Sequence, residues 1–201
     1  DATIREIHHR VKNNLQTVAA LLRLQSRRMS NSDAKDALKQ AMGRVSAIAV
    51  VHEILSQNFE EQVAFDEVAD RILHMVGDVA ASSGSVVARR EGSFGEVPAE
   101  TATALSLATT ELCQNAIEHS LDSSSGNVIV RSHRTDDALV VDIVSDGKPL
   151  PEGFSLDNHR SSLGLSIVTT LMQDLGGTFT LEDNSDRVGT CARLVIPLQR
   201  L

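Results

Sequence analysis

The stretch TIREIHHRVKNNLQTVAALLRLQSRRM, residues 3–29, sets the fold expected for the first part of this chain. Its seam residues recur at alternating intervals of four and three: Ile4, His8, Val11, Leu15, Val18, Leu22, Gln25 and Met29. This heptad spacing is typical of a long helix that packs lengthwise against another helix. The pattern therefore predicts a helix over 3–29.

A second heptad pattern follows the break SNSD at residues 30–33, where Asp33 can cap the next helix. Its seam residues are Leu38, Ala41, Val45, Ile48, His52 and Leu55. A short turn between two long helices predicts an antiparallel hairpin. Its outer apolar stripe needs a cover, either a second copy that closes a four-helix bundle or the rest of the chain. We expect the homodimer.

After Gln57 the heptads end, and helices alternate with strands. Helices are expected over 66–81, 98–121 and 162–175, and strands over 85–90, 126–134, 138–145, 178–184 and 189–198. Helices that segregate from a largely antiparallel sheet form an α+β layer fold. We expect two domains, residues 1–60 and 61–201, with a hinge near 57–63.

Composition narrows the function classes. The chain has 201 residues, 41% of them apolar, with five Phe and neither Tyr nor Trp, so its core must be aliphatic. A net charge of −8 argues against direct binding of nucleic acid, which needs a basic field. We see no apolar run of membrane-spanning length and no secretory signal. Cys113 and Cys191 lack metal-site spacing, which favours a reduced, cytoplasmic protein.

The helix expected over 98–121 carries a polar face. Glu111, Asn115, Glu118 and His119 fall on one side of it. A carboxylate with an amide oxygen suits a hard cation such as Mg²⁺. The alternative is an ordinary solvated helix face.

Glycines mark three points further along. Asp146-Gly147 follows a strand, Gly164 lies in the first turn of a helix, and Gly189-Thr190 begins the last strand. A Gly at a helix start lets a phosphate approach backbone N–H groups at the positive end of the helix. Each signal alone is weak, and their order along the chain is the stronger indication.

These motifs resemble a known family. ELCQNAIEH resembles the N box of the GHKL ATPases, SDGKPLPEGF their G1 region and SSLGLSIV their G2 region. EIHHRVKNNLQTVAALLRLQ closely resembles the phosphoacceptor segment of HisKA_2-type sensor histidine kinases. The resemblance covers nearly the whole chain. It implies a dimeric four-helix bundle followed by a Bergerat-type α/β sandwich that binds ATP with Mg²⁺.

The resemblance also implies roles at the phosphate end of the nucleotide. Asn115 would coordinate Mg²⁺, and Glu111 would lie near the γ-phosphate and orient the attacking group. His119 would approach the phosphates, and Gly164 would receive them at the helix start. Residues 151–161 would form a short lid.

At the base end, the resemblance implies that Asp146 hydrogen-bonds the adenine amino group, Gly147 lets the base sit close and Thr190 supports it. The usual G1 pattern places one residue between Asp and the first Gly, whereas Asp146 directly precedes Gly147. In a gapless register Ser145 takes the adenine-binding position. A loop shift that lets Asp146 serve is the alternative.

Of the adjacent histidines, His9 is the expected phosphoacceptor. His8 lies on the heptad seam, and His9 is rotated from it by about 100°, toward solvent. In the family motif the acceptor also directly precedes Arg, as His9 does. His52 repeats the packed position of His8 on the second helix. A shared zinc ion is disfavoured, because adjacent helical histidines point apart.

The sequence therefore predicts a protein histidine kinase, in which ATP phosphorylates His9 and the phosphoryl group then passes to an Asp of a response regulator. The resemblance offers an RNA-binding antiterminator as one output of that regulator. Residues 1–30 hold six Lys/Arg against two acids, which could attract an acidic receiver domain. Glu6 and Glu111 are candidate proton acceptors for His9. The rivals are a GHKL ATPase without phosphohistidine and a dimeric scaffold that binds nucleotide poorly.

Overall fold

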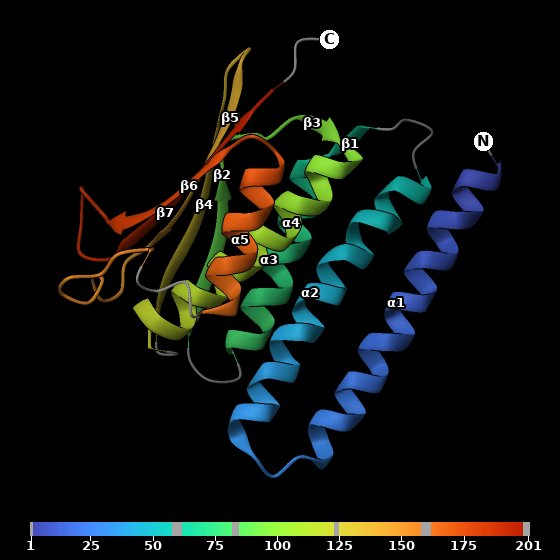
Figure 1. The fold of residues 1–201 in the computed structure, drawn as a ribbon, viewed down its shortest axis with the longest axis horizontal. Coiled ribbons are helices and arrows are strands. Elements are labelled where there is room, and N and C mark those ends of the chain that lie inside the picture. Colours follow the sequence, from blue (N-terminus) through green and yellow to red (C-terminus); the bar gives the residue numbers. More distant parts are fainter. Residues whose placement is uncertain (1, 58–61, 82–84, 123–124, 158–161, 199–201) are drawn as a thin grey trace.

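The computed structural model describes residues 2–57, 62–81, 85–122, 125–157 and 162–198. Two long helices, α1 (Ala2–Arg28) and α2 (Ser32–Gln57), form the predicted antiparallel hairpin at one side of the molecule (Figure 1). Asn31, rather than the expected Asp33, caps α2. Its Oδ1 accepts hydrogen bonds from the backbone N–H groups of Asp33 and Ala34, at 2.9 and 3.2 Å.

The contact line between α1 and α2 follows the predicted seam from His8 to Leu15, whereas Ile4, the first residue of that seam, is exposed. His8 faces His52, with their Nδ1 atoms 2.9 Å apart. Further along, the prediction was wrong, because Val18 and Met29 are exposed while Ala19 and Ser26 are buried. A straight helix has 3.6 residues per turn, so its contact line drifts away from a strict heptad after about two repeats.

The second half of the chain is a five-stranded sheet covered on one face by helices (Figure 1). In spatial order the strands are β2 (Val86–Glu91), β4 (Gly126–Arg134), β5 (Ala138–Ser145), β7 (Thr190–Pro197) and β6 (Thr178–Asp183). The covering helices are α3 (Phe65–Ala81), α4 (Ala99–Asn115) and α5 (Leu163–Asp174). Only the β2–β4 pair is parallel among these described strands, which confirms the largely antiparallel α+β layer fold.

One local prediction was wrong, and one small element was missed. The helix expected over 98–121 changes at its end, because α4 stops at Asn115 and one π-helical turn, η1 (Ala116–Ser120), follows. A small antiparallel pair, β1 (Gln62–Ala64) with β3 (Glu96–Pro98), was not expected at all. Both strands have three residues, which is too short for a periodic pattern to indicate them. Part of the hinge expected near 57–63 lies outside the described residues.

The helices α3 and α4 and the inner face of the sheet enclose an aliphatic core, as the composition predicts. The inward residues of β5, for example, are Leu139, Val141 and Ile143, all buried. The hairpin shares this core, because Val51 and Ile54 of α2 are buried in the same cluster. The second face of α2 is thus covered by the rest of the chain, packing against α4.

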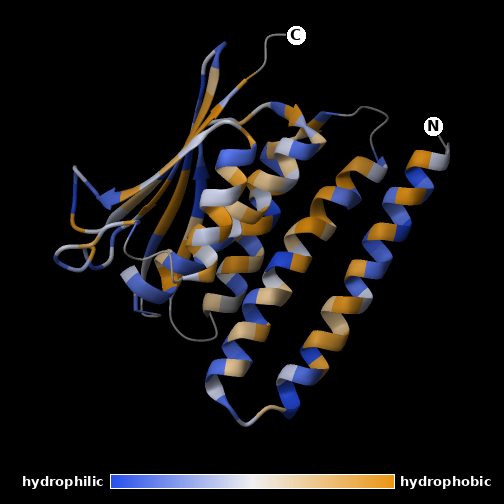
Figure 2. Cartoon of the chain, in the orientation of Figure 1, coloured by the Kyte–Doolittle hydropathy of each residue, from blue (hydrophilic) through white to orange (hydrophobic). Residues whose placement is uncertain are grey.

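Helix α1 keeps an uncovered apolar stripe (Figure 2). Its exposed large apolar side chains are Ile4, Ile7, Val18, Leu21 and Leu24, and exposed Met29 follows directly after the helix. These residues lie away from α2, so the hairpin alone does not bury them. Among the described helices, none combines the length and the apolarity that a membrane crossing requires.

Acid is expected to weaken the hairpin through His52. Burial, and then the charge of His8, lower the pKa of His52. A histidine with a lowered pKa binds fewer protons when folded than when unfolded, so its contribution to stability is full above its ordinary pKa of about 6.5 and is lost as the pH falls. We expect the Tm to drop more steeply between about pH 7 and pH 5 in the native protein than in His52→Gln. An equal fall of the Tm with pH in the two proteins would contradict the role assigned to His52.

Candidate functional site

The carboxylate of Glu111 lies in a buried ion pair on α4. The guanidinium of Arg44, from α2, donates to it through Nε and Nη2 at 2.5 and 3.1 Å. Gly164, in the first turn of α5, lies against the same carboxylate, since a Cβ there would be 2.6 Å from Oε2 of Glu111. The structure therefore brings together Glu111 and Gly164, the acid and the helix start expected near the phosphates.

Asn115 and His119 continue from this point along the same segment. Asn115 is the last residue of α4 and is half-buried, and His119 is exposed in the π-helical turn. The wider turn shifts His119 from the face that a continuous α-helix would give it. Single π-helical turns are frequent at functional sites, where they re-aim side chains.

A relay of three hydroxyl groups connects η1, β5 and β7. The Oγ of Ser145 donates to the Oγ of Ser120 at 2.7 Å and lies 2.8 Å from the Oγ1 of Thr190. Ser120 in turn donates to the carbonyl oxygen of Lys148 at 3.0 Å. Ser145 is 1% exposed and Thr190 8%, so Thr190 is the more accessible end. Each hydroxyl has one proton, so Thr190 must donate to Ser145 in this chain, and its lone pairs are left to accept.

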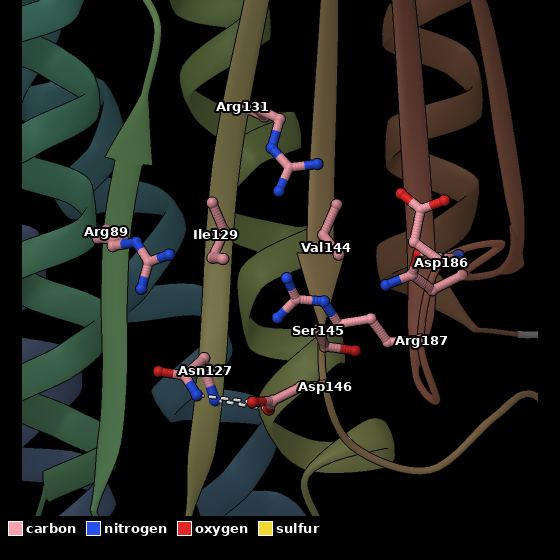
Figure 3. Close-up of a pocket in the computed structure, with 10 residues that line it drawn as sticks. Arg89, Asn127, Ile129, Arg131, Val144, Ser145, Asp146, Asp186 and Arg187 are labelled. Carbon is pink, nitrogen blue, oxygen red and sulfur yellow. Dashed lines mark hydrogen bonds between the residues drawn. The ribbon is translucent and has the colours of Figure 1, made fainter.

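The side chain of Asp146 bonds to Asn127 and not to the hydroxyl groups of this relay. Its carboxylate accepts hydrogen bonds from the backbone N–H and the Nδ2 of Asn127, at 2.7 and 2.6 Å (Figure 3). Burial opposes ionisation of this carboxyl, but the hydrogen bonds from Asn127 and from the Asp146 backbone, together with the charge of Arg187, lower the pKa of Asp146. Ser145, and not Asp146, is therefore the residue placed beside Thr190. Ser145 thus has the position that the gapless register gives it, and the adenine contact expected of Asp146 stays a prediction.

The physical reason is the alternation of side chains along β5. Ser145 ends the strand on its helix-covered face, so the next side chain points elsewhere. Asp146 instead lines a pocket of about 120 Å³ together with Asn127, Ile129 and Val144 (Figure 3). The described lining of that pocket includes neither Glu111 nor Thr190. The lining does include Ser145 and Asp146, the two residues considered for the base end of the nucleotide site.

Gly147 lies against the backbone of Ser120, while the close approach of adenine expected there stays a prediction. A Cβ at this position would collide with the backbone carbonyl of Ser120. The backbone N–H of Lys148 donates to that same carbonyl oxygen at 2.7 Å. Glycine is therefore required here to hold the loop after β5 against the π-helical turn.

His9 is exposed on α1, as the heptad argument predicts, while His8 packs against His52. The Nδ2 of Asn13 lies 3.3 Å from the Nδ1 of His9. One turn earlier, Glu6 pairs with Arg10 at 2.7 Å, and this hydrogen bond lowers the pKa of Glu6. The structure does not bring His9 to Glu111, because α2 lies between α1 and α4 (Figure 1).

The donor groups around α4 suit a cation that arrives with its phosphates. Asn115 offers one amide oxygen, and Glu111, one turn earlier, is engaged by Arg44. No group of three metal-ligating side chains occurs among the described residues. Mg²⁺ commonly takes one or two protein oxygens and completes its shell with phosphates and water, which fits this set.

Three contributors were not singled out from the sequence: Arg44, Ser120 and Asn127. Arg44 lies 67 positions before Glu111 in a helix that reads as part of the hairpin, so no local pattern connects the two. Ser120 follows His119 directly, and a hydroxyl side chain beside the N-box segment was a usable signal. Part of the expected lid, residues 158–161, lies outside the described residues.

Comparison with known families agrees with these features. The family HisKA_2, described as histidine kinase, matches residues 6–80. The family of histidine kinase-, DNA gyrase B- and HSP90-like ATPases matches residues 100–200. The first match includes most of the hairpin, with His9 and Arg44, and the second includes the candidate-site residues from Glu111 to Thr190.

Related proteins and structures point the same way. The sensor histidine kinase PdtaS of Mycobacterium tuberculosis strain H37Rv is 50% identical over all of this chain, which spans 40% of that relative's length. Blue-light-activated histidine kinase 2 of Erythrobacter litoralis is 27% identical, with 58% of its length covered. The solved histidine kinase domain of the Erythrobacter litoralis EL346 blue-light activated kinase superposes with a TM-score of 0.68 at 26% identity, covering 98% of this chain and 92% of that one.

Proposed function

Because the chain belongs to the HisKA_2 histidine kinases and carries their ATPase domain, we propose that it transfers the γ-phosphoryl group of ATP to His9 and then to an Asp of a response regulator. The observation that carries this proposal is the contrast between the two adjacent histidines. His8 is packed against His52, whereas the ring of His9 is exposed and accessible to a separately bound nucleotide.

The surroundings of His9 support a nucleophilic role. In the tautomer that is protonated at Nδ1, the exposed ring of His9 has its Nε2 lone pair available for attack. The Nε2–P bond forms as the bond from the γ-phosphorus to the leaving oxygen of ADP breaks. The ring proton is then released to a carboxylate, for which Glu6 and Glu111 are the candidates. Arg10 keeps Glu6 ionised and hence able to accept.

The residues at the end of α4 support the binding of ATP, the phosphoryl donor. We assign Asn115 to Mg²⁺, Gly164 to the phosphates and Glu111 to orientation of the attacking imidazole. The cation, when bound, neutralises the charge of the phosphates. His119, exposed in the π-helical turn, is assigned to approach the same phosphates.

Autophosphorylation tests the proposal directly. With γ-labelled ATP and Mg²⁺, we expect acid-labile label on the native chain and on His8→Gln, and a loss of label to background on His9→Gln. The reason is that only His9 offers an exposed ring nitrogen of this pair. Nucleotide binding without any label would favour the ATPase rival, and absence of nucleotide binding would favour the scaffold.

At the base end we propose recognition through the hydroxyl relay. Thr190 is the accessible end, and Ser145 holds its hydroxyl by a 2.8 Å hydrogen bond. When Thr190 donates to Ser145, its lone pairs are left to accept from the adenine amino group. Asp146, bound to Asn127, is not needed in this arrangement.

Substitutions separate Ser145 from Asp146. We expect Ser145→Ala and Thr190→Val each to weaken the affinity for ADP by roughly 3- to 10-fold, the loss of about one hydrogen bond. Asp146→Asn should change it by less than about twofold, because that side chain faces Asn127. Calorimetric titration measures all three. If Asp146→Asn weakened ADP binding more than Ser145→Ala and Thr190→Val did, the result would favour a loop shift that brings Asp146 to the base.

We further propose that the chain acts as a homodimer through α1. The exposed stripe from Ile4 to Met29 is of the kind that a second hairpin covers in a four-helix bundle. Since α2 already packs on α4, the remaining uncovered helix surface is mainly that of α1.

A charge within the stripe should separate the subunits. We expect Leu21→Glu, at a side chain 58% exposed, to convert a dimer to a monomer by light scattering after size exclusion. The matched control is Val87→Glu, at a side chain 51% exposed on strand β2, which should stay dimeric. A native chain that is already monomeric would contradict the dimer.

The partner and location follow from the same proposal. Residues 1–30 hold six Lys/Arg against two acids, an excess of positive charge that suits an acidic receiver domain, although Arg10 and Lys12 are paired with Glu6 and Glu53. An RNA-binding antiterminator output of that regulator stays a prediction from the resemblance. The cytoplasmic location stays a prediction that agrees with the free thiols of Cys113 and Cys191.

A further inference from the structure

The hairpin sits directly on the candidate site, and the contact is made by α2. Arg44 pairs with Glu111 through two donors, and the Nε2 of Gln40 lies 3.5 Å from a carboxylate oxygen of Glu118. Between them, Gly43 touches the same helix, because a Cβ there would lie 2.6 Å from the Nε2 of Gln114. One face of α2 thus covers the face of α4 that carries the catalytic acid.

This contact is a buried one. The side chains of Arg44 and Glu111 are 18% and 5% exposed, unlike the surface ion pairs of the hairpin such as Arg10–Glu6. A carboxylate buried to this degree requires a cation beside it, so Arg44 determines whether α2 can stay docked. Arg44 also occupies the carboxylate that should orient the attacking imidazole.

With α2 packed against α4 in this position, Glu111 lies too far from His9 to take part in phosphoryl transfer. His8 and His52 face each other, so the acceptor level of the hairpin lies near His52. Arg44 precedes His52 by eight residues, which places it about 12 Å away along the helix axis. His9 is moreover on α1, on the far side of α2 from α4 (Figure 1). Glu111 therefore contacts α2 instead of α1, and it does so about two helical turns away from the level of His9.

We propose that the ion pair between Arg44 and Glu111 is an autoinhibitory latch, which holds the ATPase half against its own hairpin until nucleotide phosphates compete for it. The inference rests on the proposed function for the assignment of Glu111 and Gly164. Phosphate oxygens that arrive beside Gly164 place a second anion next to the Glu111 carboxylate. A guanidinium binds phosphate and carboxylate alike, so the two anions compete for Arg44. Release of α2 then frees Glu111 to approach His9.

The first test compares Arg44→Gln with a matched control, Lys39→Gln, which removes an exposed cation of the same helix that pairs with Asp36. By linkage, loss of the latch should tighten binding of a non-hydrolysable ATP analogue by at least about fivefold, the lower end of typical coupling between sites. The initial rate of phosphohistidine formation should rise by a similar factor. Lys39→Gln should match the native protein in both measurements.

The second test closes the latch covalently. Gly43→Cys and Gln114→Cys are combined in a Cys191→Ser background, where the remaining Cys113 is buried. The pair removes the very amide that a Cβ at residue 43 would meet. A short thiol crosslinker should join the two helices, weaken binding of the ATP analogue and suppress labelling of His9, and cleavage of the crosslink should restore both. Each single Cys variant is the control.

The outcomes separate the latch from the kinase assignment. Tighter analogue binding by Arg44→Gln, without label on any variant, would support the latch and overturn the kinase function. Label on the native chain, with analogue affinity unchanged or weaker in Arg44→Gln, would overturn the latch, since Arg44 would then be neutral or a phosphate ligand. Failure of the crosslink to form, or full binding by the crosslinked protein, would overturn it too.

Discussion

The ion pair between Arg44 and Glu111 is the interaction on which the arrangement of the two halves depends. Burying a carboxylate without a partner is costly, and breaking such a pair typically costs about 3–5 kcal/mol. Around it, α2 contributes Val51 and Ile54 to the core of the sandwich, so apolar packing and charge pairing act at one contact. The hairpin is therefore packed against the ATPase half and also carries His9, the proposed phosphoacceptor.

A second constraint is the alternation of side chains where β5 ends. Ser145 faces the helices and joins the hydroxyl relay, and Asp146 faces Asn127 on the other side. One residue of register therefore exchanges a carboxylate for a hydroxyl beside Thr190. A carboxylate only accepts hydrogen bonds when ionised, whereas a hydroxyl also donates, so this change alters what the base end of the site can recognise.

Much of the fold was accessible from pattern alone, and the errors have physical causes. Apolar periodicity located both hairpin helices and every strand of the large sheet, because each spans several repeats of its pattern. The heptad failed beyond Val18, since straight helices turn every 3.6 residues, and the π-helical turn after Asn115 has no periodic signal. The structure places Glu111 against Gly164 and Ser145 against Thr190, and the roles expected of these residues and of Asp146 stay predictions.

By itself the sequence determined the family, the element order and the exposure of His9, because these depend on local spacing and on motifs within short segments. The tertiary structure alone decided which groups meet across the chain: Arg44 with Glu111, Ser120 and Ser145 with Thr190, and Asp146 with Asn127. Such contacts join residues 19 to 67 positions apart. Their geometry is set by helix packing and strand register, which no local window of sequence contains.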